Sequence, residues 1–142
     1  MSLEDVCLAC GENGESLNHI FLHCPFARIV WFGTHLSYRT PSTDVNLLQW
    51  LNQCFMFNNR EDHQLLAFME VVLQVLWRCR NLRVMEGRKV DPYAAIKMIY
   101  SSWNLYSLSF ANHSHITNHY YRPSPKQTSG QLFILCLIRE SQ

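Results

Sequence analysis

The sequence predicts an all-α fold, in which a small cysteine-rich knuckle packs on short helices and precedes a helical hairpin or bundle. Three observations predict it. Apolar residues recur at helical spacing within residues 62–86, from Leu65 to Trp77. Pro25 and Pro92 each stand where a proline suits the first turn of a helix. Alternation of apolar and polar residues, the pattern of a half-buried strand, is weak throughout the chain.

The first two helices are predicted around Pro25. Ser16 is a helix N-cap residue and begins a short helix that ends before Cys24, because the residue before a proline is pushed out of the helical region. Pro25 then opens a second helix. The apolar residues that this helix is expected to bury are Phe26, Ile29, Val30 and Trp31.

Three longer helices are expected after residue 43. Asp44 would cap the first of them, with Val45, Leu48, Leu51 and Phe55 as its apolar positions. The second covers about residues 62–86 and stops at Gly87, a common residue just past a helix end. The third starts at Pro92.

The domain organisation follows from these elements and from a change in composition. We expect an N-terminal module over residues 1–36 and a helical connector domain over residues 44–112. Residues 113–142 begin as a polar, aperiodic stretch rich in Ser, Pro and His, which predicts a disordered C-terminal tail. An apolar run of strand length, residues 131–138, interrupts it and is expected to be a truncated segment.

Composition narrows the classes of protein. The 142-residue chain is 48% hydrophobic, which excludes wholesale disorder, and no apolar run is long enough to span a membrane. The first residues show no secretory leader. Six cysteines without a leader predict a reducing compartment, where metal binding is favoured over disulfides. We therefore expect an intracellular protein, nuclear or cytoplasmic, without a membrane partner.

The N-terminal cysteines and histidines match a metal-site pattern. The spacing C-x2-C-x8-H-x4-C runs through Cys7, Cys10, His19 and Cys24. Four thiolate and imidazole ligands form the closed tetrahedral set that Zn²⁺ favours in structural sites. The alternative uses His23 as the fourth ligand, since it lies four residues after His19. We favour Cys24 because Pro25 frees it from the preceding helix, which leaves His23 as a surface or supporting residue.

The chemistry of this set indicates a structural rather than a catalytic metal. Catalytic zinc sites usually keep three protein ligands and one open position, with a general base nearby. The His-x-Glu and Pro-Cys-x-x-Cys signature of zinc deaminases is not present in the sequence. We expect a small zinc knuckle and no enzymatic activity, with no catalytic residues.

A local excess of positive charge lies in the middle of the chain. Residues 77–100 carry six Lys or Arg and two Asp or Glu, although the whole chain has a net charge of only +1. The candidate nucleic-acid-binding residues are Arg78, Arg80, Arg83, Arg88 and Lys89. A solvated helix face is the competing interpretation. If these side chains bind RNA or DNA, the binding should be weak and salt-dependent.

Two stretches together suggest a family. Residues 7–31, CLACGENGESLNHIFLHCPFARIVW, resemble the zinc-binding module of reverse transcriptases from plant LINE-type (non-LTR) retrotransposons. Residues 76–92, LWRCRNLRVMEGRKVDP, are similar to the helical connector after that module. The matching positions are Cys7, Cys10, Glu15, His19, Phe21, Cys24, Pro25, Trp31, Trp77, Arg80, Asn81, Gly87 and Lys89.

The resemblance implies a piece of a larger protein. In the family, a polymerase domain precedes the zinc module and an RNase H domain often follows the connector. Residues 131–142 contain no aspartate that could serve as the first RNase H carboxylate. We expect a fragment or remnant whose zinc module helps position RNA or DNA. A helical protein-interaction module and an inert retroelement relic remain the alternatives.

Overall fold

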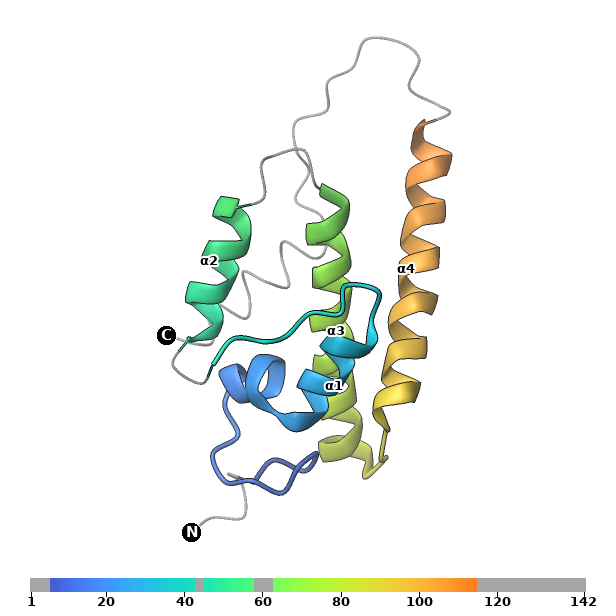
Figure 1. The fold of residues 1–142 in the computed structure, drawn as a ribbon. Helices are drawn as coiled ribbons and strands as arrows, with labels where there is room; N and C mark the ends of the chain where they lie inside the picture. The colour runs from blue at the N-terminus through green and yellow to red at the C-terminus, as the bar shows by residue number, and fades with distance from the viewer. Residues whose placement is uncertain (1–5, 43–44, 58–62, 115–142) are drawn as a thin grey trace.

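Helices and the turns between them make up the part of the protein that the structure describes. The computed structural model describes residues 6–42, 45–57 and 63–114 (Figure 1). Its elements are the π-helical turn η2 (His19–His23) and the α-helices α1 (Pro25–Gly33), α2 (Leu47–Phe57), α3 (His63–Glu86) and α4 (Pro92–Ser114). Within these ranges the only β-pairing is an isolated bridge between Val6 and Asn13. The all-α prediction is confirmed.

Two parts of the sequence prediction remain open. The predicted disordered tail falls almost wholly on residues 115–142, which lie outside the described residues. The domain boundaries stay a prediction, and η2 and α1 pack directly on α3 and α4. No helix in the described ranges is long and apolar enough to cross a bilayer.

One side-chain hydrogen bond and one proline set the boundaries of the helical segment that contains η2 and of α1. The Ser16 hydroxyl accepts a hydrogen bond from the His19 N–H at 3.1 Å, which confirms Ser16 as the cap. The Cys24 N–H bonds back to the His19 carbonyl at 2.7 Å, a five-residue step that makes this turn π-helical. Pro25 is the first residue of α1, as predicted.

A tight corner joins α3 to α4, and the two helices lie side by side in Figure 1. Gly87 has a φ of +62°, in the left-handed region that favours glycine. Its N–H bonds to the Arg83 carbonyl, and the next N–H bonds to the Leu82 carbonyl, both at 3.1 Å. The first of these bonds is that of an αL C-cap, in which the N–H of the left-handed residue returns to the carbonyl four residues earlier. Asp91 then accepts a bond from the Ala94 N–H at 2.7 Å and caps α4.

One hydrophobic core joins the N-terminal segment to the α3–α4 hairpin. Its fully buried side chains include Phe21 from η2, Trp31 from α1, Val72 from α3 and Ile99 from α4. Helix α1 approaches α4 closely, since a Cβ on Gly33 would lie 2.6 Å from Cδ1 of Ile96. The core therefore holds α1 in a fixed place against the hairpin, and the orientation of α1 matters for the site below.

The expected buried face of α1 is partly wrong. Ile29 is 55% exposed, whereas Ala27, Val30 and Trp31 are buried. These three positions follow the i, i+3, i+4 spacing of one helix face, and Ile29 points to the opposite side. Because α1 carries apolar residues on several sides, the sequence did not distinguish its inner face from its outer one.

The expected start and inner face of α2 are also corrected. The helix begins at Leu47, and the Asn46 side chain caps it by accepting a bond from the Gln49 N–H at 2.8 Å. Leu47, Trp50 and Leu51 are buried, while Leu48 is 39% exposed. Leu51 is therefore buried as predicted, whereas Leu48 lies about 100° around the helix from Leu47 and faces solvent. Asp44, the predicted cap, lies outside the described residues.

Candidate metal centre

A tight turn brings the first two cysteines together. The Cys7 N–H bonds to the Glu12 carbonyl at 2.9 Å, and the Gly11 N–H bonds back to the Cys7 carbonyl at 2.7 Å. Gly11 has a φ of +79°, which a residue with a side chain rarely adopts. The short spacing between the cysteines and this reversal put both thiols on one side of the knuckle.

Element η2 and its break supply the other two candidate ligands. His19 is the first residue of η2, and Cys24 follows the last one. Cys24 has φ −59° and ψ 132°, an extended conformation between two helical segments. That conformation is the one predicted from Pro25. It turns Cys24 out of the helical path, so that its thiol can face the knuckle.

The four side chains meet at one point. The ligand atoms of Cys7, Cys10, His19 and Cys24 all lie within 4.8 Å of one another. The two sulfurs of Cys7 and Cys24 are 3.8 Å apart, and the Cys10 sulfur is 3.3 Å from Nε2 of His19. Tetrahedral zinc with bonds of about 2.3 Å to sulfur and 2.0–2.1 Å to nitrogen would give separations of about 3.8 and 3.5 Å. The donor set fits a zinc ion.

The thiols of the cluster lie in surroundings that disfavour their deprotonated, negatively charged form. Cys7 and Cys24 are 4% and 2% exposed. Burial raises the pKa of Cys24 to about 12, the neighbouring Cys7 thiol adds to the rise, and the amides of Phe26 and Ala27 oppose it. Burial also raises the pKa of Cys10. A bound dication supplies the positive charge that stabilises such grouped thiolates.

His23 is directed away from this cluster. Its Nε2 donates to the carbonyl oxygen of Val45 at 3.0 Å, which ties η2 to the segment before α2. Its Nδ1 is buried and has no hydrogen-bond partner among the described residues. The geometry therefore agrees with Cys24 rather than His23 as the fourth ligand, although metal coordination itself stays a prediction.

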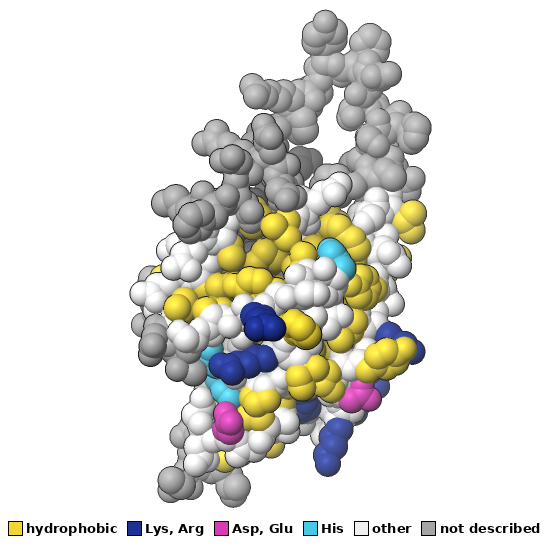
Figure 2. Space-filling view, viewed as in Figure 1, with side chains coloured by type: hydrophobic (Ala, Val, Ile, Leu, Met, Phe, Trp, Pro, Cys, Tyr) yellow, Lys and Arg dark blue, Asp and Glu magenta, His cyan; other side chains and the backbone are white. Residues whose placement is uncertain are grey.

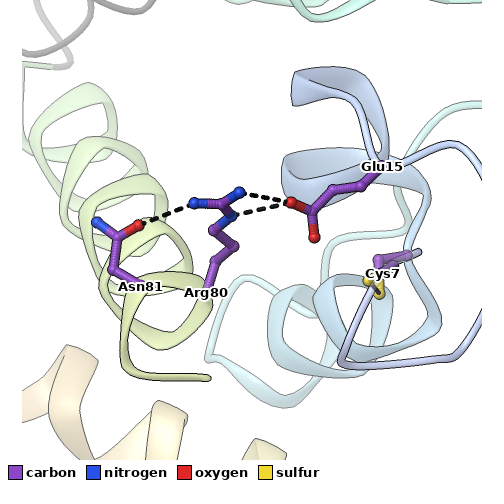
Figure 3. Close-up of polar contacts among 5 residues, drawn as sticks. Cys7, Glu15, Arg80 and Asn81 are labelled. Atoms are coloured by element: carbon purple, nitrogen blue, oxygen red, sulfur yellow. Dashed lines mark hydrogen bonds and ion pairs between the residues drawn. The ribbon is translucent and has the colours of Figure 1, made fainter. Parts of the chain in front are cut away.

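An ion pair connects the cluster's loop to α3 (Figure 3). Nε and Nη2 of Arg80 lie 2.9 and 2.8 Å from the same oxygen of Glu15. Glu15 stands in the sequence between the candidate ligands Cys10 and His19, and its side chain is only 9% exposed. Sequence reasoning missed this contact because the partners are 65 residues apart and each has an ordinary surface interpretation.

Aromatic rings also contribute to the contact of η2 and α1 with α3. Trp77 stacks on Phe21 of η2, with ring centroids 6.1 Å apart, and the Arg80 guanidinium lies 5.4 Å from the Trp77 ring. The Arg83 guanidinium lies 4.0 Å from the centroid of Phe26 and donates to the Val90 carbonyl at 3.1 Å. Arg80 and Arg83 thus stabilise the packing of η2 and α1 on α3.

The rest of the predicted basic run is on the surface. Arg88 pairs with Glu86 at 3.7 Å, and both side chains are exposed. The side chains of Arg78 and Lys89 are exposed and form no hydrogen bond or ion pair within the described part of the chain. The structure does not gather the five cations into one free surface. Their contact with nucleic acid stays a prediction.

A comparison with known protein families finds a match that covers the four clustered side chains. No curated protein and no solved structure matches the chain. Residues 1–31 match a protein-family model described as zinc-binding in reverse transcriptase. This segment contains all four cluster residues, η2 and most of α1. The N-terminal segment is therefore similar to the zinc-binding region of reverse transcriptases.

Proposed function

We propose that the chain is a non-enzymatic structural-zinc domain, a fragment or remnant of a plant LINE-type (non-LTR) retrotransposon reverse transcriptase. The observation that carries the proposal is the convergence of Cys7, Cys10, His19 and Cys24 within 4.8 Å. The family match to residues 1–31 supports the connection to reverse transcriptases. The element class rests on the resemblance of residues 7–31 and 76–92.

The structural role follows from the ligand set. Three thiolates and one imidazole complete a tetrahedral coordination shell, which leaves no open position for water or substrate. The ion would tie the knuckle to η2 and to the start of α1, and so fix short segments that bury little apolar surface alone. Such thiolates survive in a reducing compartment, the nucleus or cytoplasm.

Metal analysis of the purified full-length chain tests this proposal. We expect one zinc ion per chain. Cys24→Ala should lose the zinc and His23→Ala should keep it, because only Cys24 lies in the cluster. In a cobalt-substituted sample, the thiolate charge-transfer absorption should weaken in Cys24→Ala and stay unchanged in His23→Ala. Zinc retained by Cys24→Ala and lost by His23→Ala would move the site to a two-Cys, two-His set.

The proposal that the chain has no enzymatic activity is tested separately. The zinc-loaded chain should not degrade an RNA–DNA hybrid in the presence of Mg²⁺, because a closed zinc site supplies no activated water. Hybrid degradation that persists after repeated purification, and that changes with a substitution in the chain, would overturn it.

A further inference from the structure

A shallow cavity lies on α1 and the loop after it, on the side of α1 away from the core. Its volume is about 340 Å³. The residues that line it are Arg28, Phe32, Tyr38, Arg39, Thr40, Pro41 and Ser42. Pockets that hold small ligands span roughly 300–1,000 Å³, so this cavity has room for one planar group such as a nucleobase.

Two cations of this cavity have no anionic partner in the described part of the protein. The side chains of Arg28 and Arg39 are exposed and form no hydrogen bond or ion pair with the described residues. Figure 2 shows dark-blue Lys and Arg side chains near the centre of the view, with hydrophobic side chains close by. No acidic residue occurs between Pro25 and Ser42, and the next one along the chain is Asp44, outside the described part.

An aromatic ring stands beside these cations. Phe32 is 54% exposed although it belongs to a well-packed helix, and the Arg39 guanidinium lies 5.9 Å from the centroid of its ring. The neighbouring Ile29 is 55% exposed. An exposed aromatic ring in a cavity that also holds two guanidinium groups without an anionic partner is an arrangement with which proteins stack a base and contact its phosphates.

We propose that this cavity binds single-stranded nucleic acid, with Phe32 stacking on a base and Arg28 and Arg39 contacting adjacent phosphates. A single strand is required because bases in a duplex cover each other's faces and cannot stack on a side chain. The proposal goes beyond the structural zinc and places the contact on α1, not on the basic run of α3. Arg80 and Arg83 of that run are already held by Glu15, Phe26 and Val90.

Fluorescence anisotropy with the zinc-loaded full chain tests this surface. The probes are labelled oligouridine and oligodeoxyuridine of about 20 nucleotides, which differ only in the 2′-hydroxyl, each titrated at two or more salt concentrations. Two arginines that each neutralise one phosphate contribute about −1.4 to the slope of log K against log salt, at about −0.7 per phosphate on a single strand. Arg28→Ser/Arg39→Ser should therefore flatten the slope by about 1.4.

Stacking is tested separately. Phe32→Ala should weaken binding by roughly 5- to 140-fold without changing the salt slope, because one base stack contributes about 1–3 kcal/mol. Phe32→Tyr keeps an aromatic ring and should bind like the wild type. Arg78→Ser/Lys89→Ser removes the same charge elsewhere and should change affinity less than twofold. All variants alter exposed side chains and should keep their zinc, which separates a failure here from a failure of the zinc proposal.

Three outcomes would overturn the assignment. One is an Arg78/Lys89 control that loses as much affinity as the Arg28/Arg39 variant. Another is a Phe32→Ala variant that binds as tightly as the wild type. The third is a zinc-loaded wild type that binds neither probe even at low salt. Equal affinity for the two probes would mean that the cavity recognises the bases and phosphates that both strands share. A preference for oligouridine would indicate a further contact with the 2′-hydroxyl.

Discussion

The knuckle and the α3–α4 hairpin are stabilised in different ways, although they share one core. The hairpin buries a long series of apolar side chains and has a continuous backbone ladder; its buried residues include Phe68, Val72, Leu73, Leu76 and Ile99. Residues 6–18 contribute Cys7 as their only buried side chain and contain two glycines with positive φ. A bound metal would therefore stabilise the knuckle far more than it would stabilise the hairpin.

Chelation should have the largest effect and should act on one region. Structural zinc contributes an apparent 10–16 kcal/mol in zinc-finger peptides, so its removal should release residues 6–24. Hydrogen exchange should show faster exchange in that segment, while far-UV circular dichroism retains most of the helical signal from α3 and α4. Loss of the whole helical signal would mean that the two regions have no separate stability.

Ile99→Ala should destabilise the hairpin and leave the zinc site unchanged. Ile99 is fully buried in α4, and removing such a side chain costs about 2–5 kcal/mol. Urea unfolding should show this loss, while zinc content at saturation stays unchanged. Leu105→Ala is the matched control, because Leu105 is 68% exposed and should change stability by less than about 0.5 kcal/mol. Equal losses in the two variants would contradict the description of the core.

Arg80→Ala should weaken the connection between the regions. It removes two bonds to Glu15, whose carboxylate is nearly buried, and hydrogen bonds to charged groups contribute about 1.5–3 kcal/mol. Because Arg80 is partly exposed, we expect a loss of about 1–2 kcal/mol. Zinc affinity, measured against a competing chelator, should fall with it. Arg78→Ala is the control, and a double-mutant cycle with Glu15→Gln isolates the pair.

The smallest effect concerns pH. Burial raises the pKa of the Glu70 carboxyl on α3, and a hydrogen bond from Gln74 partly opposes the rise. The folded state then holds a proton more tightly than the unfolded state, so the free energy of unfolding falls as pH rises from the unfolded to the folded pKa. Glu70→Gln should be up to about 0.5 kcal/mol more stable than wild type at pH 7 and equal at pH 3. A less stable Gln variant at pH 7 would contradict it.

Features encoded by a few neighbouring residues were predictable from the sequence. Ser16, Pro25, Gly87 and Pro92 act on the backbone within one turn, so each boundary that they predicted is found. The candidate ligands belong to the same class, because their spacing limits how far apart their side chains can lie. The boundary of α2 is the exception, since both Asp44 and Asn46 are good cap residues.

Features that depend on distant segments were not predictable. Asn18 accepts a hydrogen bond from the Leu47 N–H at 2.7 Å, and His23 bonds to Val45, yet nothing near either residue indicates a partner across a loop. The roles of Arg80 and Arg83 were missed for the same reason. A cation's local sequence does not reveal whether a carboxylate or an aromatic ring from another element will meet it. The exposed Phe32 likewise required knowledge of which side of α1 faces the core.

The close approach of Gly33 to Ile96 has a consequence for the order of events during synthesis. A ribosome makes roughly 5–20 residues per second, so α1 exists for about 3–13 s before the part of α4 that covers it. Throughout that interval the face of α1 around Gly33 lacks its partner helix. The knuckle needs only residues already made, so early capture of a zinc ion would order the nascent segment and shorten its exposure to aggregation.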